Sequence, residues 1–266
     1  MIRSHFGIET NPFDPRSHSL LAQQQEILDT LLVHARQGGL CLLMGEPGTG
    51  KSVIKHALMQ HDKKRIITPA ISRTLHTYSN TLGILCEAFG IEPKGRDPRR
   101  EKQLIEAAWK IHAKGRQLVP IIDDAHLMHI DCLRKIRLLL EDFPKSHNLL
   151  LVAQPPLIQK LRLSINDDLR SRITYSVHLK PLAPDDVRTF ILDQLDRCGL
   201  PHNTFTDDAL ALVIRTSEGF LRRIRNLCVS ALLEAVRDRQ REVGLEQINR
   251  VLMQPHWRKE HDLAAQ

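Results

Sequence analysis

A glycine-rich octapeptide at residues 45–52, Gly-Glu-Pro-Gly-Thr-Gly-Lys-Ser, carries the clearest chemistry in the sequence. It follows the apolar run 40–44 and precedes a helical pattern, the context in which phosphate-binding loops occur. Glycines let successive backbone N–H groups turn toward phosphates at a helix N-terminus. Lys51 can reach the β- and γ-phosphates, and Ser52 can ligate Mg²⁺. We therefore expect an ATP or GTP site formed by Gly45, Glu46, Pro47, Gly48, Thr49, Gly50, Lys51, Ser52 and Val53.

A pair of acids closes a second strand-like run. Residues 118–122 are apolar and lead into Asp123-Asp124-Ala125-His126. At the carboxyl end of a parallel strand, the first carboxylate is placed to hold Mg²⁺ together with Ser52. The second, Asp124, is placed to polarise an attacking water as a general base. The alternative is a pair of acids that only solvates a strand end.

The composition suits a globular nucleotide-dependent protein. The chain has 266 residues, of which 42% are hydrophobic and 26% charged, enough for one large or two modest domains. No apolar run approaches the ~20 residues that span a bilayer, so we expect no membrane partner. The five cysteines form no C-x-x-C pair and indicate reduced thiols of a cytoplasmic protein. The net charge of +7 favours a polyanionic partner.

Strand-like runs alternate with helical patterns at 40–44, 65–70, 118–123, 149–153 and 175–179. This alternation predicts an α/β domain whose parallel sheet is covered by helices on both faces. After Pro184 only helical patterns remain, separated by Gly199 and Gly219. We expect an α/β nucleotide-binding domain over 1–180, a small helical lid domain over 181–255 and a disordered tail over 256–266.

The two motifs and their order resemble those of the AAA+ ATPases. Within that group the chain is similar to the ExeA/TnsC/TniB branch, which includes the secretion ATPase ExeA and transposition target-selection ATPases such as the Mu B protein. The resemblance covers nearly the whole chain and implies an AAA+ sheet domain, a helical lid, ATP and Mg²⁺. Besides the acidic motif, it is carried by Phe6–Phe13, Val152–Leu157, Leu169–Ile173 and Gly219–Ile224.

The same resemblance implies roles for individual residues. Gln154 would bridge the γ-phosphate and the lytic water, although a strand-end cap is the alternative. Arg172, with Arg170 as its rival, would be an arginine finger that acts on the nucleotide of a neighbouring subunit. Arg222 would reach the nucleotide from the lid. The opening segment 6–13 would wedge the adenine base or simply cap the core.

Two residues depart from the family pattern. Asp124 stands where the family has Glu, and its side chain is one methylene shorter. Because a base displaced by about 1 Å can cost ~10²-fold in rate, we expect slow hydrolysis and a long-lived ATP-bound state. Leu221 replaces the proline that normally precedes the lid arginine.

A basic stretch after the second strand is the candidate nucleic-acid contact. Residues 94–116 contain eight Lys and Arg against three acids. Such side chains track phosphates without reading bases, whereas a solvated helix face is the alternative. The residues expected to contact DNA are Arg73 and Thr74, in the connection after the second strand, together with Lys94, Arg96, Arg99, Arg100 and Lys102.

Several functions fit these features, and we prefer an ATPase that assembles as a ring or filament on duplex DNA. It would show little sequence preference and would recruit or regulate a transposase. The second function is an ExeA-like secretion ATPase, a class that normally adds a transmembrane helix and a cell-wall-binding domain, neither of which the printed sequence carries. A helicase loader or replication initiator is the third. A non-hydrolysing nucleotide-binding scaffold stays open because of Asp124.

Overall fold

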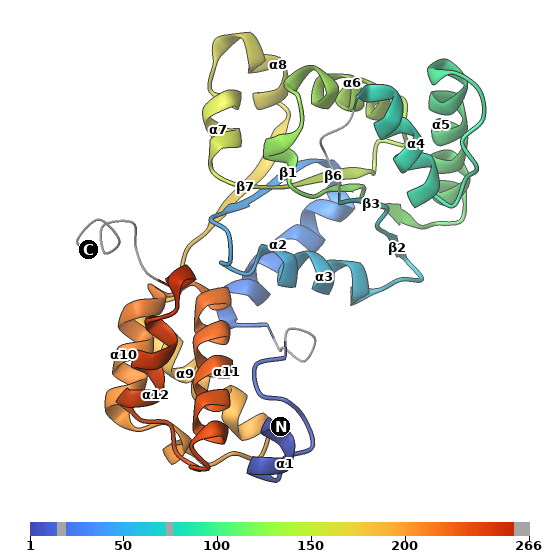
Figure 1. The fold of residues 1–266 in the computed structure, drawn as a ribbon. Coiled ribbons are helices and arrows are strands. Elements are labelled where there is room, and N and C mark those ends of the chain that lie inside the picture. Colours follow the sequence, from blue (N-terminus) through green and yellow to red (C-terminus); the bar gives the residue numbers. More distant parts are fainter. Residues whose placement is uncertain (15–19, 73–76, 258–266) are drawn as a thin grey trace. The chain divides into compact units, whose positions relative to one another are not determined.

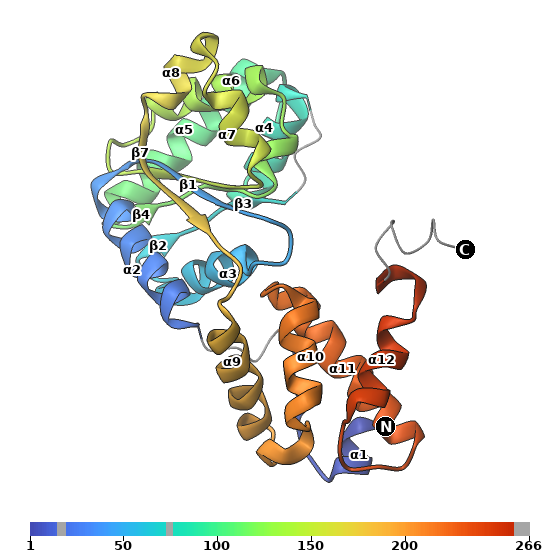
Figure 2. The same cartoon turned by 90° about the vertical axis from the view of Figure 1, so that its left-hand side faces the viewer.

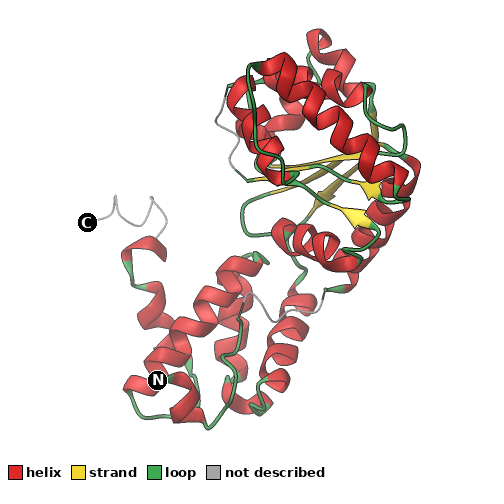
Figure 3. Ribbon diagram, turned by 90° about the vertical axis from the view of Figure 1, so that its right-hand side faces the viewer, coloured by secondary structure: helices red, strands yellow, loops and turns green. Residues whose placement is uncertain are grey.

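The computed structural model describes residues 1–14, 20–72 and 77–257. The chain divides into two compact units, one of residues 20–46 and 51–179 and the other of residues 1–19, 47–50 and 180–266. The sheets lie in the first of these, and the second is helical (Figures 1 and 3). The described part of the opening segment, residues 1–14, belongs to the helical unit.

Five parallel strands form the main sheet. In spatial order they are β3 (Ala70–Ile71), β5 (Ile121–Ile122), β6 (Asn148–Ala153), β1 (Gly39–Gly45) and β7 (Ile173–Leu179). The central strands β1 and β6 are buried almost throughout, as expected where helices cover both faces of a parallel sheet. The predicted parallel α/β sheet is therefore confirmed.

Prolines divide two of the expected strands. Pro69 separates β2 (Ile66–Ile67) from β3, and Pro120 separates β4 (Gln117–Leu118) from β5. Strands β2 and β4 pair as a separate two-stranded sheet. Proline has no N–H to donate to a ladder, which interrupts each strand. The pairing nevertheless continues past the prolines, since the N–H of Ile121 donates to the carbonyl of Pro69 at 2.8 Å.

Helices cover both faces of this sheet (Figure 2). Alternate residues of β1 point to opposite faces, with Leu42 in one core and Cys41 and Leu43 in the other. One face carries α2 (Ala22–Gln37) and α3 (Lys51–His61). The other carries α4 (Tyr78–Ala88), α5 (Asp97–Ala113), α6 (Ile130–Glu141), α7 (Pro156–Leu161) and α8 (Asp167–Arg170).

The helical unit follows β7 in the chain. It contains α9 (Pro184–Arg197), α10 (Asp207–Ser217), α11 (Leu221–Arg237) and α12 (Leu245–Leu252). The side chain of Thr206 caps α10 by accepting the N–H of Ala209 at 3.1 Å. A 3₁₀ turn at Pro255–Trp257 follows α12, and the rest of the expected disordered tail, 258–266, lies outside the described residues. Within the described ranges, no helix has the length and apolar character to cross a membrane.

The opening segment packs on helices of its own unit. After the short helix α1 (Ile2–Phe6), Ile8 and Phe13 are buried. The ring of Phe13 lies 6.4 Å from that of Phe190 on α9. This packing accounts for the apolar residues of the segment as a cap on the helical core, and the adenine contact stays a prediction.

Candidate nucleotide site

The sheet topology brings the predicted motifs to one edge. Strand β6 lies between β5 and β1, and all three run parallel. The carboxyl ends of these strands therefore meet, and each is followed by one of the motifs. The glycine-rich loop follows β1, the acidic pair follows β5, and Gln154 follows β6. This edge is the expected place for a ligand in an open α/β sheet.

The glycine-rich loop has the backbone that its sequence predicts. Gly48 (φ 88°) and Gly50 (φ 110°) lie in the left-handed region that favours glycine. Helix α3 begins at Lys51, whose Nζ donates to the carbonyls of Gly45 at 2.7 Å and Glu46 at 2.9 Å. The loop's own carbonyls thus hold the ammonium group. Of the other predicted ligands, Thr49 is buried, Val53 is partly buried, and Glu46, Pro47 and Ser52 are exposed.

The first acid of the pair is held by two donors. Oδ1 of Asp123 accepts the N–H of Asp124 at 3.0 Å, and Oδ2 lies 2.5 Å from Nζ of Lys55. Sequence reasoning missed Lys55. Its signal was a lysine one helical turn after Lys51, among residues that pack into the core.

The second acid has an unusual backbone. Asp124 adopts φ 51° and ψ 36°, in the left-handed region. Among residues other than glycine, Asp and Asn enter this region most readily, because a short polar side chain can hydrogen-bond locally. This conformation therefore favours Asp over the longer Glu of the family pattern. Backbone strain of this kind gathers at functional sites, although it assigns no role by itself.

A buried histidine connects the acidic segment to the end of β6. Nδ1 of His126 accepts the backbone N–H of Gln154 at 3.4 Å. The backbone carbonyl of His126 accepts a hydrogen bond from Nζ of Lys160 at 3.0 Å. Burial lowers the pKa of His126, and nearby Lys51 lowers it further, while Asp124 raises it. A neutral ring with Nδ1 as acceptor fits this bonding.

The donor atoms present fit Mg²⁺. The Ser52 hydroxyl and the Asp123 carboxylate are the hard oxygen ligands that this ion prefers. Across the described ranges, no group of three or more His, Cys, Asp or Glu side chains gathers to form a metal cage. Mg²⁺ commonly takes its remaining ligands from phosphate and water, so two protein donors suffice.

Both arginine-finger candidates are exposed at the surface of the sheet unit. Arg172 has 63% of its side chain exposed and lies 3.5 Å from Oε1 of Glu141. Arg170 is 51% exposed and is paired with Asp167 of its own helix at 2.9 Å. The choice between the two arginines stays open.

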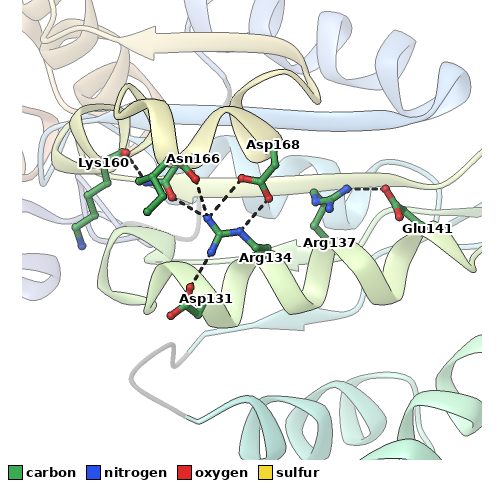
Figure 4. Close-up of polar contacts among 8 residues, drawn as sticks. Asp131, Arg134, Arg137, Glu141, Lys160, Asn166 and Asp168 are labelled. Carbon is green, nitrogen blue, oxygen red and sulfur yellow. Dashed lines mark hydrogen bonds and ion pairs between the residues drawn. The ribbon is translucent and has the colours of Figure 1, made fainter.

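Arg134 on α6 anchors the segment that carries these arginines (Figure 4). Its guanidinium donates to Asp168 Oδ2 at 2.9 Å, to Asn166 Oδ1 at 2.9 Å and to the carbonyl of Ile165 at 3.2 Å. It also donates to Asp131 on its own helix at 2.7 Å. Sequence reasoning did not single out Arg134, because its partners Ile165, Asn166 and Asp168 lie more than thirty residues away in the chain.

The lid candidate lies in the helical unit. Arg222 is exposed in the first turn of α11, and its role stays a prediction. The turn before this helix is built on Gly219 (φ 76°), whose carbonyl accepts the N–H of Leu182 at 2.9 Å. A Cβ at Gly219 would lie 2.2 Å from the carbonyl oxygen of Leu182, so only glycine fits.

The residues predicted to contact DNA differ in how far their side chains are exposed to solvent. Lys94, Arg96, Arg99 and Lys102 are exposed around the start of α5. Arg100 is half-buried, and its guanidinium donates to the carbonyl of Ser79 at 3.1 Å and to its hydroxyl at 3.2 Å. Arg100 therefore ties α5 to α4. Arg73 and Thr74 lie outside the described residues.

Comparison with known proteins defines the class of this fold. A family model described as an AAA domain matches residues 34–161. The fold is also similar to solved structures at 16% identity: ORC2 of Aeropyrum pernix (TM-score 0.69, 96% of this chain, 74% of that one) and Cdc6p of Pyrobaculum aerophilum (0.72, 96% and 73%). RuvB of Thermotoga maritima, a Holliday junction branch migration motor, matches with a TM-score of 0.60 at 15% identity, over 91% of this chain and 73% of that one. The chain thus has the α/β AAA+ fold, as the resemblance implied.

A curated relative adds a more specific similarity. General secretion pathway protein A of Aeromonas hydrophila is 29% identical over 248 residues, which cover 88% of this chain and 45% of the relative. The chain therefore spans just under half the length of that protein. The similarity to this relative extends across both units, whereas the family model covers part of the sheet unit.

Proposed function

We propose that this chain binds ATP with Mg²⁺ and hydrolyses it slowly, in assembly with copies of itself. One observation carries the proposal. The glycine-rich loop, the acidic pair and Gln154 follow three adjacent parallel strands at the same sheet edge. An AAA domain implies nucleotide binding, and AAA+ proteins typically self-associate, which supports both parts of the proposal.

Each residue of this edge has a part in the proposed reaction. Backbone N–H groups of the loop and Lys51 bind and orient the phosphates. Asp124 takes a proton from the attacking water, and the amide of Gln154 holds that water in line. Ser52 and Asp123 would hold Mg²⁺, which would supply charge stabilisation at the phosphates. Arg172 of a neighbouring subunit, or its rival Arg170, neutralises the charge that develops in the transition state.

For the process that this ATPase drives, we infer a general secretion pathway of the kind for which the Aeromonas relative is named. The identity to that relative extends over 248 residues, across the helices after residue 180 as well as the sheet. This similarity supports the secretion function over the transposition function that the resemblance to target-selection ATPases suggested. The lid role of Arg222 and a boundary near residue 180 belong to the same proposal.

Binding to duplex DNA is the second candidate function, favoured by a specific feature. Lys94, Arg96, Arg99 and Lys102 place exposed positive charge around the start of α5, countered nearby by Glu92 and Asp97. Side chains of this kind bind phosphates without reading sequence. A transposase as client belongs to this candidate.

Two measurements test these proposals. Phosphate release should occur at a rate per subunit that rises with protein concentration, because the finger acts between subunits. A rate that is constant from dilute to concentrated protein would contradict assembly. Fluorescence anisotropy with labelled duplex DNA then distinguishes the DNA-binding function from the secretion function. ATP-dependent binding that weakens steeply with salt and is lost in Arg99→Ala/Lys102→Ala would favour the DNA function, and absence of binding at low salt would exclude it.

A further inference from the structure

Lys55, which forms a buried ion pair with Asp123, has no part in the reaction outlined above. The ammonium lies 2.5 Å from Oδ2 of Asp123, and the two side chains are only 9% and 16% exposed. The other oxygen, Oδ1, accepts the N–H of Asp124 at 3.0 Å. Both oxygens of the carboxylate expected to hold the metal are therefore engaged by donors of the protein itself.

The position of Lys55 in α3 makes this pair unusual. The neighbouring residues Ile54 and Leu58 are buried in the core, so a hydrophobic residue would also fit position 55. Lysine is almost never buried unless it is paired, because removing its charge from water is costly. Lys55 lies four residues after Lys51 and three after Ser52, so the helix directs all three toward one side. The positive charge of Lys55 therefore lies at the end of the site that is expected to hold the metal and the phosphates.

We propose that Lys55 is a resident counter-cation of the nucleotide site, which neutralises Asp123 so that nucleotide phosphates bind with or without Mg²⁺. The inference rests on the proposed nucleotide site. Without Lys55, the carboxylate of Asp123 would repel the phosphates across a partly buried site, where screening by salt is weak. When Lys55 is present, Asp123 contributes less to the binding of Mg²⁺, because the ammonium group already engages one of its oxygens. Nucleotide affinity should therefore depend only weakly on Mg²⁺.

The test compares the affinity for a fluorescent ADP analogue in excess Mg²⁺ with the affinity in EDTA. In Lys55→Met we expect the dissociation constant in EDTA to rise by about tenfold or more relative to wild type. In Mg²⁺ the rise should be much smaller, since the ion replaces the missing charge. Lys55→Arg keeps the cation and should keep the wild-type ratio of the two constants. Lys64→Met removes an exposed charge just after α3 and serves as the matched control.

A second variant separates charge from packing. Removing one partner of a buried pair leaves a costly unpaired charge, so Lys55→Met is expected to be less stable than wild type. The double variant Lys55→Met/Asp123→Asn is neutral at both positions. It should bind the ADP analogue in EDTA with the affinity of wild type. Adding Mg²⁺ should raise its affinity less than it raises that of wild type. Loss of EDTA binding in the double variant would show that Lys55 acts in another way and would overturn the inference.

The outcomes distinguish this inference from the function on which it rests. Equal ratios of the EDTA and Mg²⁺ dissociation constants in Lys55→Met and wild type would overturn the counter-cation role. Failure of the wild-type chain to bind the analogue in either buffer would instead refute the nucleotide site itself.

Discussion

Replacing Gly219 by alanine tests how the helical unit is built around the lid candidate. Gly219 has φ 76°, and its carbonyl accepts the N–H of Leu182 at 2.9 Å. A Cβ at this position would lie 2.2 Å from the oxygen and 2.8 Å from the nitrogen of Leu182. These atoms are backbone and cannot move aside as a flexible side chain would. The turn before α11, and with it Arg222, depends on this close approach.

The expected cost of Gly219→Ala has two parts. The left-handed backbone costs a residue with a Cβ about 1–2 kcal/mol. Relief of the clash requires the two segments to separate, which costs about 1–3 kcal/mol for overpacking. Separation also weakens a hydrogen bond worth about 1 kcal/mol. Together these give a loss of about 4 kcal/mol in the free energy of unfolding, a large share of the ~5–15 kcal/mol of a typical domain.

Gly199→Ala is the matched control in the same unit. Gly199 has φ 73°, and a Cβ there would meet nothing within 4 Å, so only the backbone cost applies. Urea denaturation followed by far-UV circular dichroism should show a loss of about 1–2 kcal/mol for this control. The difference between the two variants isolates the clash with Leu182. A loss in Gly219→Ala no greater than that in Gly199→Ala would refute the reasoning.

Three further predictions concern turnover and acid stability. Asp124→Ala should abolish phosphate release and leave nucleotide affinity unchanged, because the base acts only on water; normal turnover would assign the base elsewhere. Arg172→Ala should lower turnover by about 10³-fold, and mixing it with Lys51→Ala subunits should restore part of it at mixed interfaces. The same mixing with Arg170→Ala decides between the rivals, since only the true finger shows restoration. Burial lowers the pKa of His147 in the folded state, so the unfolded chain binds more protons below about pH 6.5. The stabilisation that comes from keeping His147 neutral should therefore be fully present above about pH 6.5 and be lost on acidification. The urea midpoint should fall less on acidification in His147→Gln than in wild type, and equal falls would contradict this.

The parallel sheet was predictable because its signals are local. Apolar runs such as 40–44 and 149–153 are long enough to identify central strands covered on both faces. The division of two other strands by Pro69 and Pro120 follows from the missing N–H of proline, which the sequence displays but which we did not use. The opening segment was harder, because burial of Phe13 depends on Phe190, far away in the chain.

The site divides in the same way between local and long-range information. The glycine-rich loop and the acidic pair are contiguous motifs, and each lies where its strand predicts. Lys55 was missed because its partner, Asp123, is 68 residues away. Arg100 was assigned to DNA from charge alone, and its bonds to Ser79 appear only when α4 and α5 pack together. Spacing along the chain cannot reveal such pairs.

The claim that residues 45–52 bind nucleotide phosphates is tested most directly by the affinity of Lys51→Ala for ATP. Lys51 lies at the mouth of the loop, where its ammonium is held by the carbonyls of Gly45 and Glu46. Isothermal titration calorimetry should show affinity lowered by about tenfold or more, at least about 1.4 kcal/mol, with Lys64→Met unchanged. Equal affinity of Lys51→Ala and wild type, or no binding by wild type, would contradict the account.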